Sequence, residues 1–279
     1  MEIKKAAIFF NPSRESCAAA ADALAQAAQK SGINYYFADY SASLNDVEKD
    51  TDIIFSVGGD GTILKTARAA AKSNIKILGI NAGHLGFLAA AERGLDFVKL
   101  FEDIKKDNFI SQRRMMLNCR VYRQGREVFG DLALNEAAVR AVSPRSVKLS
   151  AQYCSLPIKE YTGDGILAAT PTGSTAYNLA AGGPIAMPEL DVFILTPICP
   201  HTLNQRPLLL PSAGELRVKV MSEKSQSDAA LSLDGQINFP LDCGDEISIK
   251  NYEGGVNILF PKGYDFFNIL SIKLKWDSR

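Results

Sequence analysis

The sequence predicts an α+β protein of two domains, an N-terminal α/β domain followed by an antiparallel β-sandwich domain. Over residues 1–100, apolar strands alternate with helix-forming segments, which is the pattern of a Rossmann-like parallel sheet flanked by helices. Beyond residue 112, short runs of alternating apolar and polar residues are separated by Gly, Asn, Asp and Pro turns. That pattern is typical of antiparallel strands. We therefore expect an α/β domain at residues 1–111 and a β-rich domain at residues 112–256.

The N-terminal domain is expected to open with a strand and a helix. The apolar run Ala6–Phe10 predicts the strand, and the alanine-rich run Glu15–Lys30, followed by Gly32, predicts the helix. The remaining strands of this domain are expected at 33–38, 53–57 and 76–81.

In the second half, strict alternation is clearest at Leu216–Val220 and Glu246–Lys250, and both predict strands with one buried face. Further strands are expected at 131–134, 166–169 and 231–233. The tail 263–276 combines a short apolar stretch of helical character with an alternating run that contains two lysines.

A glycine turn at residues 58–62, with the sequence GGDGT, links the strand at 53–57 to a helix. This order aims backbone N–H groups and the positive end of a helix at one point, which suits phosphate. Gly58, Gly59 and Gly61 permit close approach to a ligand, and Thr62 can act as the N-cap of the helix. These four residues are the candidate phosphate-binding group.

Asp60 is the unexpected residue of this turn, because a carboxylate repels phosphate unless Mg²⁺ or a substrate hydroxyl lies between them. Asp60 is therefore the candidate catalytic residue for phosphoryl transfer to an alcohol. The alternative is a structural role for Asp60 in the turn.

Other phosphate-binding motifs are excluded. The chain contains no G-x-x-x-x-G-K-[ST], and Leu64 stands where a dinucleotide fingerprint requires Gly or Ala. The segment 163–168 satisfies G-x-G-x-x-[GA] by letter, but a strand rather than a helix is expected to follow it.

A second polar block runs from Thr170 to Asn178 and ends at Gly182-Gly183-Pro184. Its hydroxyl, amide and aromatic side chains form a candidate ligand-binding rim, although an ordinary turn with N-capping has a similar composition. Polar residues also follow the strands expected at 131–134 and 231–233.

Taken together and in order, these segments resemble the NAD kinase family. The resemblance covers roughly residues 52–276 and rests on GGDGT (58–62), GINAGHLGFL (79–88), LNE (134–136), DGILAATPTGSTAYNLAAGGPI (164–185), LTPICPH (195–201), RPLLLP (206–211) and LDGQ (233–236). GGDGT alone is shared by phosphofructokinases and lipid kinases. The chain departs from many relatives at His84 and Met187, neither of which is expected to carry the chemistry.

The resemblance implies an NAD kinase that transfers phosphate from ATP or polyphosphate, with Mg²⁺, to the 2′-hydroxyl of the adenosine ribose of NAD. Asp60 would assist that hydroxyl. The family's dinucleotide-contacting positions correspond to Asn135, Glu136, Asp164, Thr172, Thr175, Ala176, Tyr177 and Asp234. Asp234 alternatively lies by the phosphates as a second carboxylate. No dedicated protein site for the metal is expected, because the phosphates hold Mg²⁺.

Two further expectations follow from the resemblance. Cys199 and His201 are candidate contacts to the site of a neighbouring subunit in a homo-oligomer, a dimer or a tetramer. The tail 257–279 is expected to pack back on the first domain. Independently of the resemblance, a lone histidine after Gly83 is typical of a turn or helix cap, so His84 is expected to be at most a phosphate contact.

Composition indicates a cytoplasmic protein without a nucleic-acid or membrane partner. Its 279 residues include 31 basic and 31 acidic side chains, so broad attraction to polyanions is excluded. No signal peptide or membrane span is visible, and five cysteines without C-x-x-C argue against disulfides and zinc.

Two other functions stay open. A lipid kinase would share GGDGT, and a non-enzymatic NADP(H) sensor would share the fold. A lipid kinase would show a basic or apolar surface for a membrane, and a sensor would most simply have lost Asp60, which is present.

Overall fold

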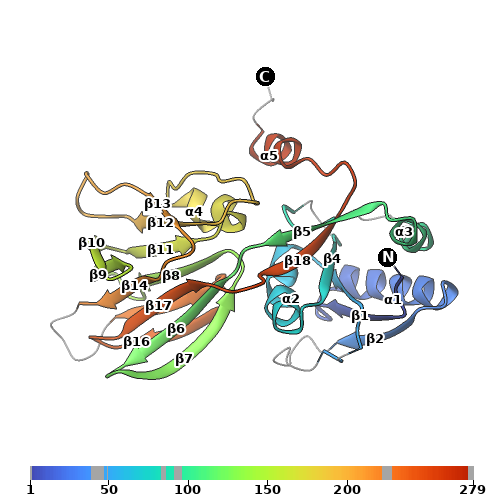
Figure 1. The fold of residues 1–279 in the computed structure, drawn as a ribbon, viewed down its shortest axis with the longest axis horizontal. Coiled ribbons are helices and arrows are strands. Elements are labelled where there is room, and N and C mark those ends of the chain that lie inside the picture. The colour runs from blue at the N-terminus through green and yellow to red at the C-terminus, as the bar shows by residue number, and fades with distance from the viewer. Residues whose placement is uncertain are drawn as a thin grey trace. The chain divides into compact units, whose positions relative to one another are not determined.

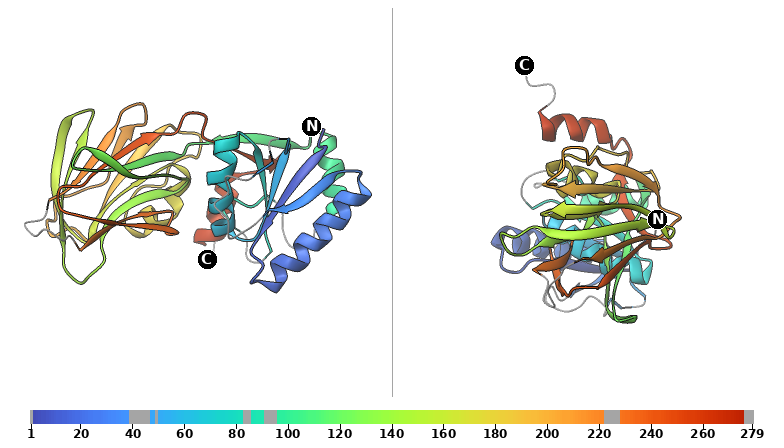
Figure 2. Two further views of the ribbon diagram at one scale, coloured as in Figure 1. Left: turned by 90° about the horizontal axis from the view of Figure 1, so that it is seen from below. Right: turned by 90° about the vertical axis from the view of Figure 1, so that its left-hand side faces the viewer.

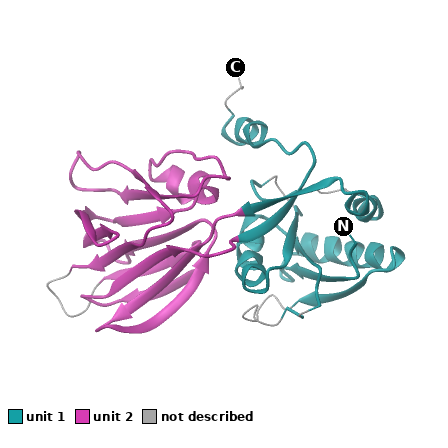
Figure 3. Ribbon diagram, viewed as in Figure 1, with its two compact units in different colours: residues 1–113, 256–279 teal, residues 114–255 magenta. Residues whose placement is uncertain are grey.

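The computed structural model describes residues 2–38, 47–48, 50–82, 86–90, 96–221 and 228–275. The chain divides into two compact units (Figure 3), of which unit 1 contains residues 1–113 and 256–279 and unit 2 contains residues 114–255. No helix in the described part of the chain is long and apolar enough to cross a membrane.

Unit 1 is built on a sheet with the strand order β2-β1-β3-β4-β18-β5 (Figure 1). Strand β1 pairs in parallel with β2 and β3, and β4 pairs in parallel with β3 and β18. Its elements are β1 (Lys5–Phe10), α1 (Glu15–Lys30), β2 (Asn34–Ala38), β3 (Ile53–Val57), α2 (Asp60–Ser73), β4 (Lys76–Ile80), α3 (Phe97–Lys105), β5 (Phe109–Arg114), β18 (Val256–Pro261) and α5 (Phe266–Leu274).

Helices α1 and α2 cover opposite faces of this sheet (Figure 2), as expected when a chain crosses between parallel strands in both directions. The buried residues of α1 recur at helical spacing, and Leu24 and Ala28 are fully buried in a core that also contains Phe55 and Phe101. Strand β3 is buried along its whole length, and all of its residues except Ser56 are apolar, as is typical of a strand covered on both faces.

Helix α3 is an element that the sequence analysis does not predict. Its N-cap is Asp96, whose carboxylate accepts hydrogen bonds from the backbone N–H groups of Val98 at 2.9 Å and Lys99 at 3.3 Å. An Asp before an apolar run is a recognisable helix start, so the signal was present in the sequence.

Unit 2 is a sandwich of two antiparallel sheets. One has the order β10-β9-β14-β17-β6-β7 and the other β13-β12-β11-β8-β15-β16. The elements are β6 (Leu117–Arg123), β7 (Arg126–Ala133), β8 (Glu136–Ala141), β9 (Val147–Tyr153), β10 (Leu156–Gly163), β11 (Gly165–Ala169), the 3₁₀ helix η2 (Thr172–Thr175), α4 (Tyr177–Ala180), β12 (Val192–Ile198), β13 (Leu208–Pro211), β14 (Leu216–Val220), β15 (Ala229–Leu233), β16 (Ile237–Leu241) and β17 (Glu246–Asn251).

Alternate residues of both sheets meet in one core, in which Val121 and Ile247 of the first sheet join Val139 and Leu231 of the second. The opposite face of β8, β11 and β12 has its own apolar cluster, which includes Ala138, Leu167 and Ile194 together with Ala186. The segment that contains η2 and α4 therefore lies on the outer face of the second sheet. The predicted fold class, an α/β domain with an antiparallel β-sandwich, is confirmed.

Candidate functional site

The glycine turn follows β3, and its tightness depends on Gly58. At this position φ is +157°, and an added Cβ would lie 2.3 Å from the hydroxyl oxygen of Thr62. The expectation that Thr62 caps the helix is wrong, because Gly59 is the N-cap and Thr62 already belongs to the first turn of α2. Gly59 has a negative φ, and a Cβ there would meet no atom within 4 Å.

Asp60 is the first residue of α2, and its carboxylate is held by a segment far along the chain. Its two oxygens accept hydrogen bonds from the backbone N–H groups of Phe87 at 3.0 Å and Leu88 at 3.2 Å. Gly86 lies directly against this carboxylate, because a Cβ on Gly86 would come within 2.0 Å of Asp60 Oδ1. Each carboxylate oxygen has a further lone pair, so Asp60 can still accept a proton or a hydrogen bond. His84 lies outside the described residues.

In unit 2, three strand ends bring polar residues to one edge of the second sheet. Glu136 begins β8 in register with Ala169 at the end of β11, and Ala137 is in register with Leu233 at the end of β15. Asp234 follows directly with a left-handed backbone, φ +52°. Strand register therefore gathers residues that are up to about a hundred positions apart in sequence.

The carboxylate of Asp234 is buried and accepts three backbone hydrogen bonds. The donors are the N–H groups of Leu134 at 3.1 Å, Asn135 at 2.7 Å and Glu136 at 3.3 Å. Three N–H donors stabilise an ionised carboxylate. Asp234 thus fixes the conformation of the LNE segment.

Glu136 lies beside Asp234, and its side chain is almost completely enclosed, since only 6% of the residue is exposed. Burial, followed by the charge of Asp234, raises the pKa of Glu136 to about 8, and a hydrogen bond from the backbone of Tyr177 opposes this shift. Among the described residues, Glu136 Oε2 and the Thr172 hydroxyl are buried without a hydrogen-bond partner. Buried polar atoms without partners are rare in native proteins, and these two belong to residues that the sequence predicts to contact the dinucleotide.

The hydroxyl-rich segment is seated against the LNE segment by backbone contacts. Thr170 N–H donates to the carbonyl of Asn135 at 2.8 Å, and the Thr170 hydroxyl donates to the carbonyl of Leu134 at 2.6 Å. A Cβ on Gly173 would lie 2.1 Å from the Asn135 carbonyl oxygen. Only glycine permits this close approach. Gly173 therefore fixes where the neighbouring residues Thr172, Thr175 and Ala176 lie.

Asn178 has a structural role within this segment. It is fully buried, its amide nitrogen donates to the carbonyls of Ser174 and Pro184, and its amide oxygen accepts a hydrogen bond from the Thr196 hydroxyl at 2.7 Å. Tyr177, its neighbour, is 36% exposed. The ring of Tyr177 is therefore the accessible aromatic surface of this segment.

The phenol of Tyr177 interacts with groups at both ends of β8. Burial raises the pKa of Tyr177, Arg140 opposes the shift, and Cys199, Asp164 and Glu136 add to it. Asp164 accepts a hydrogen bond from the Cys199 thiol, which raises the pKa of that thiol. Cys199 therefore lies next to Asp164 of its own chain.

Two other residues complete this end of the sheet. His201 N–H donates to the carbonyl of Thr162 at 2.9 Å, and the His201 side chain is exposed. Arg140 is a residue that the sequence analysis does not predict at the site. It lies on the same face of β8 as Glu136, four residues after it. Its signal is a lone arginine at an exposed position of a strand whose other residues, apart from Glu136, are apolar.

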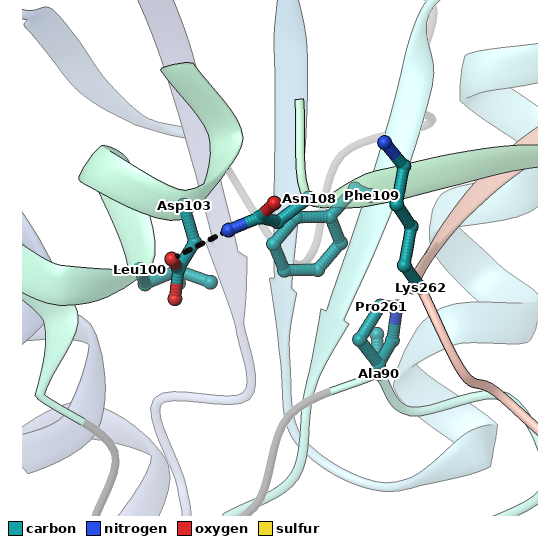
Figure 4. Close-up of a pocket in the computed structure, with 7 residues that line it drawn as sticks. All are labelled: Ala90, Leu100, Asp103, Asn108, Phe109, Pro261 and Lys262. Atoms are coloured by element: carbon teal, nitrogen blue, oxygen red, sulfur yellow. Dashed lines mark hydrogen bonds between the residues drawn. The ribbon is translucent and has the colours of Figure 1, made fainter. Parts of the chain in front are cut away.

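Unit 1 also has a cavity of about 460 Å³ (Figure 4), which is large enough for a small molecule. It is lined by Ala90, Leu100, Asp103, Asn108, Phe109, Pro261 and Lys262. The amide of Asn108 donates to Asp103 at 3.0 Å across one side of it. None of the residues that the motifs single out belongs to this lining.

The site residues predicted from the sequence thus fall into two groups. Asp60 and the glycine turn belong to unit 1. The predicted dinucleotide-contacting residues belong to unit 2, where the sheet edge brings together Asn135, Glu136, Thr172 and Asp234 and the ring of Tyr177 extends toward Asp164.

Two family models match the chain. The model of the ATP-NAD kinase N-terminal domain matches residues 11–108, and the model of the ATP-NAD kinase C-terminal domain matches residues 134–258.

Curated relatives share about a third of the sequence over most of its length. The chain is 32% identical to an NAD kinase of Geotalea daltonii over 291 aligned residues, which cover 99% of this chain and 100% of the relative. It is 39% identical to an NAD kinase of Heliobacterium modesticaldum over 236 residues, 84% of this chain and 82% of the relative.

Solved structures share the fold of the whole chain. Yeast NADH kinase in complex with NADH matches with a TM-score of 0.85 and 25% identity, covering 100% of this chain and 89% of the yeast chain. An NAD kinase from Archaeoglobus fulgidus in complex with ATP matches with a TM-score of 0.77 and 27% identity, covering 97% and 98% of the two chains.

Proposed function

The chain belongs to the NAD kinase family, and from this premise we propose that it transfers the terminal phosphoryl group of ATP to the 2′-hydroxyl of the adenosine ribose of NAD, giving NADP. The comparisons give no support to a lipid kinase or to a non-enzymatic sensor. The observation that carries the proposal is the position of Asp60, a carboxylate at the first residue of a helix, fixed by two backbone N–H groups.

Asp60 accepts the proton of the attacking hydroxyl. An alcohol is a weak nucleophile, and a positioned carboxylate that takes its proton as the bond to phosphorus forms contributes to the rate. The backbone N–H groups at the start of α2 bind phosphate, with Gly58, Gly59, Gly61 and Thr62 forming the turn. Gly58 keeps this turn narrow, since any side chain there would strike Thr62.

Unit 2 binds the dinucleotide through the group at the sheet edge. Asn135, Glu136 and Thr172 offer amide, carboxyl and hydroxyl groups to the ribose and the base, and Tyr177 offers an exposed ring face. Thr175 and Ala176 belong to the same segment as Thr172, and Asp164 directly precedes strand β11 of the second sheet. Asp234 acts here by holding the backbone of the LNE segment, because its two oxygens already accept three N–H bonds.

Mg²⁺ accompanies the phosphoryl donor. Among the described residues, no three His, Cys, Asp or Glu side chains are grouped as a metal site. Mg²⁺ commonly binds through phosphates, water and one or two carboxylates, and the single carboxylate of the glycine turn fits that mode. When bound, Mg²⁺ neutralises charge on the transferring phosphates. Polyphosphate is an alternative donor, since backbone N–H groups and Mg²⁺ make no base-specific contact.

The active protein is a cytoplasmic homo-oligomer, a dimer or a tetramer, in which Cys199 and His201 contact a neighbouring subunit. Exposed apolar side chains on the nearby segment support this contact, because Leu203 is 90% exposed and Leu209 is 57% exposed. All five cysteines are free thiols, as expected in a reducing compartment. Light scattering at assay concentration tests the assembly, and a fully active monomer would contradict it.

The activity is tested with purified protein, Mg²⁺, ATP and NAD. NADP is measured with an NADP-specific dehydrogenase, which does not respond to other phosphorylated products. Asp60→Asn should keep NAD binding and lower the rate about 10²-fold. No NADP from the wild-type protein would refute the proposed reaction, and wild-type turnover in Asp60→Asn would refute the role of Asp60.

A further inference from the structure

Glu136 and Asp234 are neighbouring acids with very different hydrogen bonding. Asp234 accepts three backbone N–H bonds, whereas in the described part of the chain the Glu136 carboxyl accepts only the backbone N–H of Tyr177. Two adjacent carboxylates in a buried place repel each other when both are ionised. Asp234 has the donors that stabilise a negative charge, so Glu136 is the member of the pair that holds a proton.

Among the described residues, no cation acts on the carboxyl group of Glu136 to reverse this assignment. Asp234 faces it from the turn after β15, and Tyr177 faces it from α4. Strand β11 contributes the uncharged residue Ala169 opposite Glu136. Arg140, on the same strand, is four residues away and acts on the phenol of Tyr177, as do Asp164 and Cys199.

The unsatisfied atoms at this place define what a ligand must supply. Among the described residues, Glu136 Oε2 and the Thr172 hydroxyl are each buried without a partner. A vicinal diol such as that of ribose supplies two O–H donors and two acceptor oxygens. Two O–H bonds added to the N–H bond of Tyr177 would give Glu136 three donors, the number that Asp234 has in the free protein.

We propose that Glu136 is a protonated acid in the free protein and becomes a carboxylate when a ribose diol of NAD binds, so that NAD binding releases one proton to the solvent. This inference rests on the proposed function, because it requires NAD to occupy unit 2. The proton leaves the Glu136 carboxyl group and is taken up by the buffer, while both ribose hydroxyls keep their protons and donate to the carboxylate. Glu136 thereby couples NAD affinity to pH.

Calorimetric titration of the full chain with NAD, without ATP, tests the coupling. At pH 7 in phosphate and in Tris, which differ in ionisation enthalpy, the binding heats should differ by the amount expected for about one released proton per NAD. Affinity should rise with pH, by up to about tenfold per unit below pH 8, and level off above it. Glu136→Gln has no proton to release, so its heats should be the same in both buffers. Glu253→Gln, which removes an exposed carboxylate elsewhere in unit 2, should release the proton as the wild type does.

A second measurement does not depend on the variant binding NAD. In protein labelled with ¹³C at glutamate carboxyl carbons, one resonance of the free wild type should titrate near pH 8, be missing from Glu136→Gln, and move to the carboxylate position at pH 7 when NAD is added. NAD binding with equal heats in both buffers, or with no such resonance, would overturn the inference and leave the proposed function intact. Failure of the wild type to bind NAD would overturn both.

Discussion

The carboxylate of Asp60 packs directly against Gly86, a residue twenty-six positions later. The approach is so close that the Cβ atom of any other residue type at position 86 would overlap the carboxylate. A Cβ at position 86 would lie 2.0 Å from Oδ1 of Asp60 and 2.6 Å from its carboxyl carbon. The neighbouring N–H groups of Phe87 and Leu88 hold the same carboxylate. Residues 86–88, at the end of the GINAGHLGFL motif, therefore hold Asp60 in position, a role that the sequence alone does not reveal.

Gly86→Ala should displace Asp60 and lower the rate of NADP formation about 10²-fold, as loss of a positioned base does. Because the clash is with the end of a side chain that can rotate away, the fold should survive. The measurements are kcat and the thermal midpoint. Gly130→Ala is the matched control, since the added methyl there would lie 3.1 Å from the carboxylate of Glu127, on an exposed strand. Equal activity of the two variants would contradict the role of Gly86.

Tyr177→Ala should weaken NAD binding by about 1 kcal/mol, roughly fivefold, if the exposed ring packs on the dinucleotide. The thermal midpoint should change little, because the side chain is 36% exposed. Calorimetry or fluorescence titration gives the dissociation constant. An unchanged constant would leave Tyr177 as a packing residue of α4.

Unlike Tyr177→Ala, Asn178→Ala should lower the stability of the fold and not remove a direct contact with NAD. The substitution leaves the buried Thr196 hydroxyl and the carbonyls of Ser174 and Pro184 without their partner. The expected cost is about 2 kcal/mol in the free energy of unfolding, measured by urea denaturation. Wild-type stability in this variant would show that the 172–186 segment is held by other contacts.

Stability should depend on pH through Glu136. Burial and Asp234 raise its pKa from 4.5 to about 8, so between these values the folded state holds a proton that the unfolded chain has lost. The resulting stabilisation is present in full below pH 4.5 and is lost as the pH rises through 8. Glu136→Gln carries no such dependence, so its thermal midpoint relative to the wild type should increase from pH 5 to pH 9. A constant difference over this range would contradict the raised pKa.

The strand-turn-helix unit around Asp60 could be predicted because its signals are local. A mainly apolar run, a glycine turn and a helical pattern lie next to one another in sequence, and the observed β3 and α2 follow them closely. The family resemblance, carried by short motifs of fixed spacing, is confirmed. The sequence favours Thr62 as the N-cap, but Gly59 takes that position, because the start of a helix after a glycine turn depends on backbone angles that the sequence does not specify.

The sequence by itself determined the alternation of strands and helices in the first half, the antiparallel character of the second and the residue types available for phosphoryl transfer, since each follows from local periodicity or from a motif. Only the tertiary structure decided which of these residues touch. Strand register brings Glu136 against Asp234, and the folded chain brings Gly86 against Asp60. The buried oxygens that lack a partner at Glu136 and Thr172 also appear only after folding. Burial and hydrogen bonding are properties of the surroundings, which come from distant parts of the chain, and they set the protonation state of a carboxyl group that sequence alone leaves undetermined.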